Sequence, residues 1–476
     1  MSKPSIPQGT RDFSPAEVRR RQHILNALKN IFEKYGFEPI ETPSMENLST
    51  LTGKYGEEGD RLIFKILNNG LNVQPEDQKA AKLSEFKKIL NFEEFSTLNR
   101  AYSSAEITER ALRYDLTIPF ARYVVMHQND IAFPFRRYQM QPVWRADRPQ
   151  KGRYREFWQC DADIIGSTSL INEAELISIY HDAFQEFAIP VIIKINSRKV
   201  LAGIADLCGV PEQLTEMTVA LDKLDKIGWD GVFNELQSRN IPVEKFHIIR
   251  EIVENTESRN QTDSIRLLKD FFTGSATGLK GIEEIETTLR HYHNLGNHQS
   301  NACSVGIDIT LARGLNYYTG IIAEVVCNHA DIKMGSLGGG GRYDDLTGLF
   351  GLKGVSGVGV SFGIDRIYDV MEELKLFPDE YRTGTRVLII NFGEESEAYS
   401  LNLLHKLRNA GVSTEFYPDS TKFDKQMKYS NKRGIPFVVM PGEEERKQNL
   451  VSLKNLNSGT QVMVTVDEAI AMVSSS

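Results

Sequence analysis

The sequence predicts an α+β protein with an antiparallel sheet flanked by helices, a helical insertion in that domain, and a C-terminal α/β domain. Strand-like runs and turn residues alternate up to about residue 199 and again from 303 to 363. The stretch between them is helical and charged, and from about residue 385 strands and helices alternate as in a parallel sheet. We therefore predict a core domain at 1–199 and 301–380, an insertion domain at 200–300 and a final domain at 385–476.

The size and composition of the chain fit several soluble domains. Its 476 residues exceed the length at which one hydrophobic core stops growing, and its composition of 41% hydrophobic and 25% charged residues is ordinary. We find no signal peptide and no membrane span, so we expect a cytoplasmic protein without membrane contact. The four cysteines form no CxxC pair, which argues against a zinc ribbon and a disulfide framework. Because the net charge is −8, a nucleic-acid partner is expected only at local basic patches.

The core domain begins with a predicted helix. Ser14 and Glu17 form a capping box before apolar residues at helical spacing, and Gly36 ends the run. A short strand then closes on Pro43 in the segment ETP. Residues 71–109 are polar, rich in lysine and glutamate, and helical in pattern, and we interpret them as an insertion.

A basic stretch in the core domain is unexpected in an acidic chain. Residues 135–160 hold two carboxylates and seven cations, which are Arg136, Arg137, Arg145, Arg148, Lys151, Arg153 and Arg155. We predict a hairpin with strands at 138–145 and 155–163, joined by a loop with Pro149 and Gly152 as turn residues.

Alternation along this hairpin separates a polar face from a core face. Gln139 and Arg145 share a face of the first strand, and Gln159, Asp161 and Asp163 share a face of the second. A solvated sheet face would explain the pattern. The directional hydrogen-bonding side chains and the arginine-rich loop also fit an anion site, because a planar guanidinium binds phosphate through paired hydrogen bonds.

Two further arginines occupy positions that suit an anion. Arg313 lies at a glycine-bounded break in LARGLNYYTG, just before two tyrosines, and a surface turn with packed tyrosines is the alternative. Arg366 falls in the first turn of a predicted helix, where a cation opposes the helix dipole. Asp365 or Asp369 could compensate it, and so could a nucleotide phosphate.

Other familiar site patterns are missing or weak. GSLGGGGRYDDL lacks the lysine of a P-loop, and GVSGVGVSFG has the wrong glycine spacing for a dinucleotide-binding turn. His291, His293 and His298 are close in sequence, but their spacing points them to different sides of a helix, so we predict no metal site made of protein side chains. Asp115 and Thr117 share one face of an extended segment, which is also typical of a turn or a cap.

Together these segments resemble the histidyl-tRNA synthetases, a family of class II aminoacyl-tRNA synthetases. ETP is similar to the first class II motif, VWRADRPQKGRYREFWQCDADIIG to the second and GVGVSFGIDRI to the third, while LARGLNYYTG is peculiar to the histidine enzymes. The resemblance covers essentially the whole chain apart from 71–109. It implies a class II antiparallel catalytic sheet, a C-terminal anticodon-binding domain, and a homodimer formed through the first motif.

The resemblance implies an ATP-dependent histidine–tRNA ligase, which forms histidyl-adenylate and pyrophosphate and then transfers histidine to the 3′ end of tRNA(His). Arg145 matches the residue that holds the α-phosphate of ATP, and Arg366 the residue that holds the γ-phosphate. Arg313 matches the catalytic arginine, aimed at the α-phosphate and the histidine carboxylate. Arg153 belongs to the loop that closes over ATP, and Mg²⁺ accompanies the nucleotide.

The family positions also imply amino-acid and RNA contacts. The residues matched to histidine binding are Asp115, Thr117 and Gln159 at the α-amino group, Asp163 and Tyr318 at the imidazole, and Arg313, Tyr317 and Tyr343 elsewhere in the pocket. The residues assigned to tRNA are Arg148 and Gln150 at the acceptor end, and Lys422, Lys425, Lys428, Lys432 and Arg433 in the C-terminal domain. A solvated helix face is the alternative for the latter group. The helical insertion is expected to clamp the tRNA.

One residue departs from the family pattern. Asn316 stands in RGLNYY where the family commonly has aspartate, so a carboxylate charge is lost near Arg313. A non-catalytic relative that senses histidine or regulates its biosynthesis is the alternative function. Such relatives lack the C-terminal domain and tend to lose the arginine motifs, whereas Arg145, Arg313 and Arg366 are all present here.

Overall fold

The computed structural model describes residues 3–69, 108–244, 246–257, 260–296, 303–312, 317–378 and 383–474. They form two compact units, the first made of Met1–Arg11 and Ile24–Leu376 and the second of Asp12–His23 and Phe377–Ser476. Arg313, Asn316 and nearly all of the predicted insertion at 71–109 lie outside the described residues.

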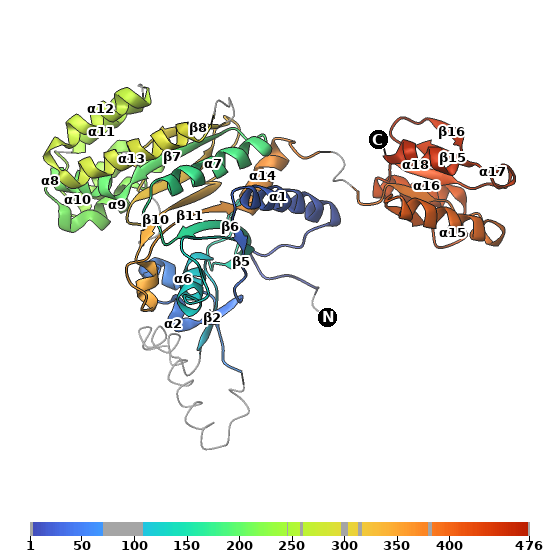
Figure 1. Cartoon of the computed structure of the whole chain (residues 1–476), viewed down its shortest axis with the longest axis horizontal. Coiled ribbons are helices and arrows are strands. Elements are labelled where there is room, and N and C mark those ends of the chain that lie inside the picture. The colour runs from blue at the N-terminus through green and yellow to red at the C-terminus, as the bar shows by residue number, and fades with distance from the viewer. Residues whose placement is uncertain are drawn as a thin grey trace, which may run out of the picture. The chain divides into compact units, whose positions relative to one another are not determined.

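An eight-stranded sheet forms the centre of the first unit (Figure 1). In spatial order its strands are β1 (Glu38–Pro39), β5 (Phe135–Trp144), β6 (Glu156–Ile165), β11 (Ser356–Gly363), β10 (Gly338–Asp344), β9 (Ile321–Cys327), β7 (Val191–Ser197) and β8 (Cys303–Ile307). The two edge pairs are parallel, and the pairs between them are antiparallel. The predicted α+β fold with an antiparallel sheet is confirmed.

The predicted hairpin is present, and its strands β5 and β6 pair along ten residues each. Arg137 lies opposite Asp163 in this register. The alternative of a solvated polar face is wrong, because Gln139 is fully buried and Asp161 and Asp163 are each only 2% exposed.

Helices pack on the sheet through a cluster of aromatic rings. Four helices come directly before or after strands of this sheet in the sequence, namely α1 (Pro15–Lys34), α6 (Thr117–Met126), α7 (Ile171–Glu186) and α14 (Ile364–Glu373). Phe362 of β11 meets Tyr180 and Phe184 of α7 at centroid distances of 4.7 and 6.0 Å, and Phe32 of α1 at 5.9 Å. Burial of these rings stabilises the first unit. Because side chains alternate along each strand, the polar residues lie on the opposite face of the sheet.

A small sheet with short helices adjoins the polar face. Its strands are β2 (Met45–Asn47), β4 (Arg110–Leu112) and β3 (Lys65–Ile66), and its helices are α2 (Leu48–Leu51) and α3 (Gly56–Arg61). The prediction of one strand closing on Pro43 is wrong, since β1 ends at Pro39 and a non-strand segment leads to β2. The buried Arg113 fixes this segment, because its Nη1 donates to the carbonyls of Thr42 and Pro43 at 2.7 and 3.3 Å.

The segment between β7 and β8 is helical, as predicted. Its α-helices are α8 (Arg198–Cys208), α9 (Leu214–Leu221), α10 (Leu224–Ser238), α11 (Phe246–Glu257), α12 (Gln261–Phe271) and α13 (Ala276–Asn294). Helices α8 and α13 approach closely because glycines face each other, and a Cβ on Gly203 would lie 2.4 Å from the Cα of Gly278.

The second unit contains a five-stranded sheet. Its strands, in spatial order, are β13 (Thr414–Phe416), β12 (Val387–Ile389), β14 (Phe437–Met440), β15 (Val451–Asn455) and β16 (Gln461–Val464). Its helices are α15 (Glu394–Asn409), α16 (Phe423–Arg433), α17 (Glu443–Gln448) and α18 (Val466–Ser474). The first three strands are parallel, as predicted, whereas β15 and β16 add an antiparallel edge that the sequence pattern did not reveal. Side chains of β12 alternate between two apolar clusters, so both faces of the sheet are buried.

The predictions about membrane spans and cysteine pairing concern the whole chain and can be compared with the described residues. No helix among them is long and apolar enough to cross a membrane. All four cysteines are free thiols, and three of them are buried.

Candidate active site

The polar face of the large sheet carries buried ionisable side chains. Arg137 from β5, Asp161 and Asp163 from β6, and Asp115 before α6 are each no more than 2% exposed. Burying carboxylates costs free energy unless cations or hydrogen-bond donors compensate them. Such a cluster is therefore a candidate for a functional site.

Asp163 is held from two sides above a glycine. The Nη2 of Arg137 lies 2.7 Å from its Oδ2, and the Tyr343 hydroxyl donates to its Oδ1 at 2.6 Å. Gly359 of β11 pairs with Asp163, and a Cβ at that glycine would lie 1.9 Å from Oδ1. A Cβ on Gly357 would lie 2.3 Å from the Tyr343 ring. The glycines of GVSGVGVSFG thus make room for a carboxylate and a phenol.

Asp115 keeps an oxygen that no described residue donates to. Its Oδ1 accepts hydrogen bonds from the Tyr55 hydroxyl at 2.9 Å and the Ile118 backbone N–H at 3.2 Å, while Oδ2 has no donor among the described residues. Burial raises the pKa of Asp115, and the positive charge of Arg145 opposes that rise. Thr117 is the first residue of α6 and hydrogen-bonds Tyr317.

Asp161 lies between Gln139 on β5 and Ser361 on β11 in the strand register. Its Oδ1 also has no donor among the described residues. Burial raises the pKa of Asp161 to about 7, a rise that Arg137 opposes and Asp163 adds to. The site therefore has spare acceptor oxygens, which suit a cationic ligand that donates hydrogen bonds, such as an ammonium group or a ring N–H.

Arg145 follows β5 and is fixed in orientation. Its Nε donates to the Tyr114 carbonyl at 3.0 Å and its Nη2 to Gln159 Oε1 at 3.4 Å. Its guanidinium carbon lies 4.3 Å from the centroid of the Tyr114 ring and 5.2 Å from that of Phe157. Gln159 in turn donates to Ser361 Oγ at 2.7 Å. The structure thus places a cation beside the buried carboxylates.

Arg366 lies in the first turn of α14 and contacts the hairpin loop. Its Nε donates to the Gly152 carbonyl at 2.8 Å and its Nη1 to the Ser336 carbonyl at 2.7 Å. The neighbouring acids have other contacts, since Asp365 pairs with Arg11 and Asp369 accepts from the Tyr154 hydroxyl at 2.9 Å. Arg366 therefore connects the loop after β5 to the start of α14.

The rest of that loop is exposed. Arg153 is half exposed, with its Nη1 3.6 Å from Asp147 Oδ1, and its backbone pairs with that of Gln150. Arg148 and Gln150 are both exposed. This arrangement leaves the loop accessible to a large polyanion.

Some of the cations in residues 135–160 form ion pairs within the protein. Three of the seven cations pair with acids beyond that stretch, namely Arg136 with Glu175 at 2.7 Å, Arg137 with Asp163 at 2.7 Å and Lys151 with Glu373 at 2.9 Å. The anion-site interpretation of this stretch then depends on Arg145 and the loop cations.

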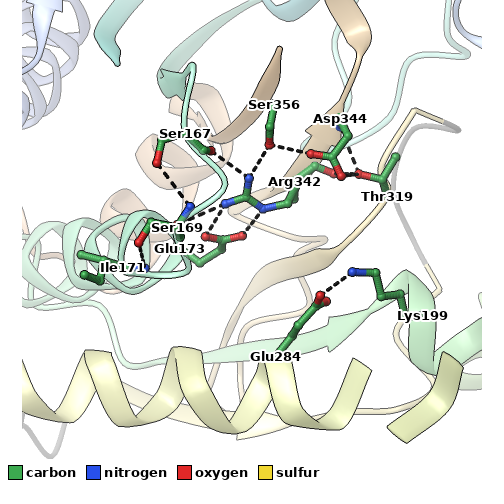
Figure 2. A network of polar contacts seen from close by, with 10 residues as sticks. All are labelled: Ser167, Ser169, Ile171, Glu173, Lys199, Glu284, Thr319, Arg342, Asp344 and Ser356. Atoms are coloured by element: carbon green, nitrogen blue, oxygen red, sulfur yellow. Dashed lines mark hydrogen bonds and ion pairs between the residues drawn. The ribbon is translucent and has the colours of Figure 1, made fainter. Parts of the chain in front are cut away.

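A polar network fixes the segment that carries the site tyrosines (Figure 2). The Tyr317 ring lies 5.0 Å from that of Tyr318 and 6.2 Å from that of Tyr343. Directly after them, Thr319 Oγ1 donates to Asp344 Oδ2 at 2.7 Å and its backbone N–H donates to the Arg342 carbonyl at 2.8 Å.

Arg342 is the centre of this network. Its Nε and Nη2 donate to the two oxygens of the buried Glu173 at 2.5 and 2.7 Å. Its Nη1 donates to Ser356 Oγ at 2.5 Å, and that hydroxyl donates to Asp344 Oδ1 at 2.5 Å. Figure 2 shows Glu173 of α7 and Ser356 of β11 pointing toward the guanidinium, with Asp344 of β10 linked to it through Ser356.

Several other predicted residues have contacts of their own. Lys422, Lys425, Lys428 and Lys432 are exposed at or on α16, whereas Arg433 pairs with Glu415 at 2.9 Å. His293 contacts the Leu289 carbonyl through Nδ1, and His298 lies outside the described residues. The described part of the chain contains no group of three His, Cys, Asp or Glu suited to a metal ion.

Sequence reasoning missed the partners that hold the site together. Arg137 was counted only as one of seven cations, and Tyr55 and Arg342 were not singled out. Each acts on a residue far away in sequence, Asp163, Asp115 and Glu173 respectively. No local pattern indicates such pairs.

Comparison with protein families decides the classification. A family model described as histidyl-tRNA synthetase matches residues 9–73 and 105–367, and a model described as anticodon binding domain matches 386–476. The chain belongs to the histidyl-tRNA synthetase family. A histidine–tRNA ligase of Bacteroides fragilis (strain YCH46) is 50% identical over 469 residues, which is 98% of each chain. The ligase of Christiangramia forsetii is 52% identical over 460 residues, covering 96% of each.

Solved structures of the family agree with this fold. The histidyl-tRNA synthetase of Nostoc sp. PCC 7120 superposes with a TM-score of 0.80 at 30% identity and covers both chains completely. The apo enzyme of S. aureus, at 20% identity and a TM-score of 0.64, supports the fold alone.

Proposed function

We propose that the polar face of the large sheet forms histidyl-adenylate, with the residue roles given below. Similarity to histidine–tRNA ligases over 98% of the chain shows that its activity is ATP-dependent ligation of histidine to tRNA. The observation that carries the residue assignment is the buried set of carboxylates with spare acceptor oxygens directly beside Arg145. This set supplies acceptors for an amino acid and a cation for a phosphate.

The histidine side of the site consists of two acids. Asp115, with Thr117 and Gln159, binds the α-ammonium group through the spare Oδ2. Asp163, fixed by Tyr343 and Arg137, accepts a hydrogen bond from the imidazole N–H, and Tyr318 is the second imidazole contact. An amino acid without a ring N–H leaves the buried Asp163 carboxylate underpaired, which disfavours its binding.

The ATP side of the site consists of arginines. A carboxylate oxygen of histidine attacks the α-phosphorus, and the bond to the bridging oxygen breaks to release pyrophosphate. Positioning and stabilisation of the developing phosphoryl charge dominate such a reaction. Arg145 and Arg313 serve the α-phosphate, Arg366 the γ-phosphate, and Arg153 closes over the nucleotide from the loop.

Mg²⁺ accompanies ATP in this scheme, with phosphate and water oxygens as most of its ligands. The ion supplies charge neutralisation at the phosphates.

The residues assigned to tRNA contacts are exposed and therefore accessible to an RNA. Arg148 and Gln150 extend from the exposed loop beside Arg366 and meet the acceptor end. In the second unit the exposed lysines of α16 meet the anticodon side, while Arg433 serves that helix structurally through Glu415. We also propose a cytoplasmic homodimer formed through the ETP segment, and a helical insertion that clamps the tRNA.

Exchange of pyrophosphate into ATP tests these roles. We expect exchange with histidine alone among the twenty amino acids, and a loss of at least about a hundred-fold in Arg313→Ala, as for removal of one stabilising group in other enzymes. Arg250→Ala is the matched control, because the Arg250 side chain on α11 is 43% exposed and forms a local ion pair with Glu254. Wild-type exchange in Arg313→Ala would refute its catalytic role.

The sensor alternative has little support. A solved structure titled as an ATP phosphoribosyltransferase regulatory subunit/histidyl-tRNA synthetase from Bacillus halodurans C is 21% identical, so it indicates only a shared fold. Histidine binding without any exchange would favour that alternative and make Asn316 the first residue to restore to aspartate.

A further inference from the structure

The second unit presents two large exposed aromatic rings at one place. Phe392, just beyond β12, is 47% exposed and Phe423, at the start of α16, is 40% exposed. Their ring centroids lie 6.4 Å apart, and the ring planes differ by only 5°. Two parallel phenylalanine rings in water lose hydrophobic stabilisation unless a ligand covers them.

The topology of this unit places the rings where ligands bind in α/β sheets. Strand β12 is parallel to β13 on one side and β14 on the other, and the chain runs from β12 to β13 before returning to β14. Such a change in strand order opens a crevice at the carboxyl ends of the strands. Phe392 lies in the loop at the carboxyl end of β12.

Buried amides hold the two loops in place. Gln426 of α16 is fully buried; its Nε2 donates to the carbonyl of Asn391 at 2.9 Å, and its Oε1 accepts from the Asn391 N–H at 2.9 Å. The Asn391 side chain donates to the carbonyls of Tyr417 and Pro418 at 3.2 and 3.3 Å and accepts from the Gly393 N–H. The phenylalanines are therefore presented on a fixed backbone.

The surroundings favour an RNA base as the occupant. Lys422 and Lys425 flank Phe423 and are exposed, so they can meet phosphates, while Glu394 and Glu395 follow Phe392 and can accept hydrogen bonds from base amino groups. Proteins read single-stranded RNA loops by stacking unpaired bases on aromatic side chains. The residues also fall within the anticodon binding domain match at 386–476.

We propose that Phe392 and Phe423 form a stacking platform for an unpaired base of the tRNA anticodon loop, presented by the Asn391–Gln426 amide pair. The proposal rests on the proposed tRNA function and specifies how this unit contacts the RNA. The platform contributes affinity for the anticodon loop and leaves histidine activation unchanged.

Binding of a labelled tRNA(His) anticodon stem-loop to the full-length protein tests the platform. We expect Phe392→Ala and Phe423→Ala each to raise Kd about ten-fold, the size of one lost base stack, and Phe392→Tyr to retain wild-type affinity. Leu401→Ala is the control, because Leu401 of α15 is 46% exposed in the same unit. Histidine-dependent pyrophosphate exchange should be unchanged in all four variants.

An abasic substitution at each loop nucleotide in turn identifies the stacked base. When the stem-loop is abasic at that nucleotide, and at no other, Phe392→Ala should cause no further loss of RNA affinity. Unchanged Kd in both alanine variants, with intact exchange, overturns the platform. A change in oligomeric state with unchanged RNA affinity overturns it as well and assigns the rings to a protein contact. Absence of histidine-dependent exchange in the parent protein would instead be a failure of the proposed function.

Discussion

Substituting Gly359 by alanine should damage the histidine pocket while sparing the fold. The added Cβ would lie 1.9 Å from Asp163 Oδ1, whereas ordinary contacts begin near 3.4 Å, so the carboxylate must move by about 1.5 Å. A shift of that size breaks the 2.6 Å hydrogen bond from Tyr343. Hydrogen bonds to charged groups contribute about 1.5–3 kcal/mol. We therefore expect kcat/KM for histidine in pyrophosphate exchange to fall about 10- to 150-fold, with little change in KM for ATP.

A neighbouring glycine provides the control for this experiment. A Cβ on Gly339 of β10 would meet only the Ala323 carbonyl, at 3.4 Å, so Gly339→Ala should fit and keep wild-type kinetics. Alanine at a compatible glycine site stabilises slightly through the unfolded chain. Equal kinetics of Gly359→Ala and wild type, or equal damage in both variants, would refute the argument that Gly359 makes room for the Asp163 carboxylate.

Three other substitutions follow from the site geometry. Because burial raises the pKa of Asp161 to about 7, the folded chain holds a proton there that the unfolded chain loses near pH 4; the stability this gives is full at low pH and is lost as the pH rises through 7. Asp161→Asn should therefore raise Tm over wild type by more at pH 8 than at pH 5. Thr319→Val removes the 2.7 Å bond to Asp344 that anchors the site tyrosines, and should raise KM for histidine about ten-fold. Arg145→Lys cannot keep both the Tyr114 contact and a planar fork on phosphate, and should lower exchange about a hundred-fold.

Each of these outcomes has a control or a contradicting result. A Tm gain for Asp161→Asn that is equal at both pH values would show that ionisation is not its cause. Thr218→Val, which removes a hydroxyl from a buried threonine of α9, should leave KM for histidine unchanged. If Arg145→Lys raised KM for histidine but spared KM for ATP, the assignment of Arg145 to the phosphate would be wrong.

The sequence predicted the sheet and its site because the relevant information is local. Alternation along the β5–β6 hairpin put Gln159, Asp161 and Asp163 on one face, and the structure has them there. Helical patterns likewise predicted the insertion, and the alternation of strands and helices predicted the first three strands of the second unit and the two helices between them. The hairpin's polar face was open to two interpretations, since alternation alone does not say whether a polar face is covered.

Long-range pairs were beyond prediction from sequence. Arg137 lies on the polar face, Arg113 and Tyr55 lie beside it, and each binds a partner from another element. The spacing of glycines in GVSGVGVSFG became meaningful only when β11 was placed beside β6, where Gly359 faces Asp163. The antiparallel edge formed by β15 and β16 was missed because short strands carry no sign of their direction.

Competition by a stable histidyl-adenylate analogue tests the central claim most directly, namely that histidine and ATP bind side by side on one sheet face. The analogue, with a sulfamoyl linkage in place of the phosphate ester, should compete with both histidine and ATP in exchange assays and lose affinity in Gly359→Ala but not in Gly339→Ala. The corresponding alanyl analogue should bind far more weakly. Competition with only one of the two substrates, or equal affinity for both analogues, would contradict the account.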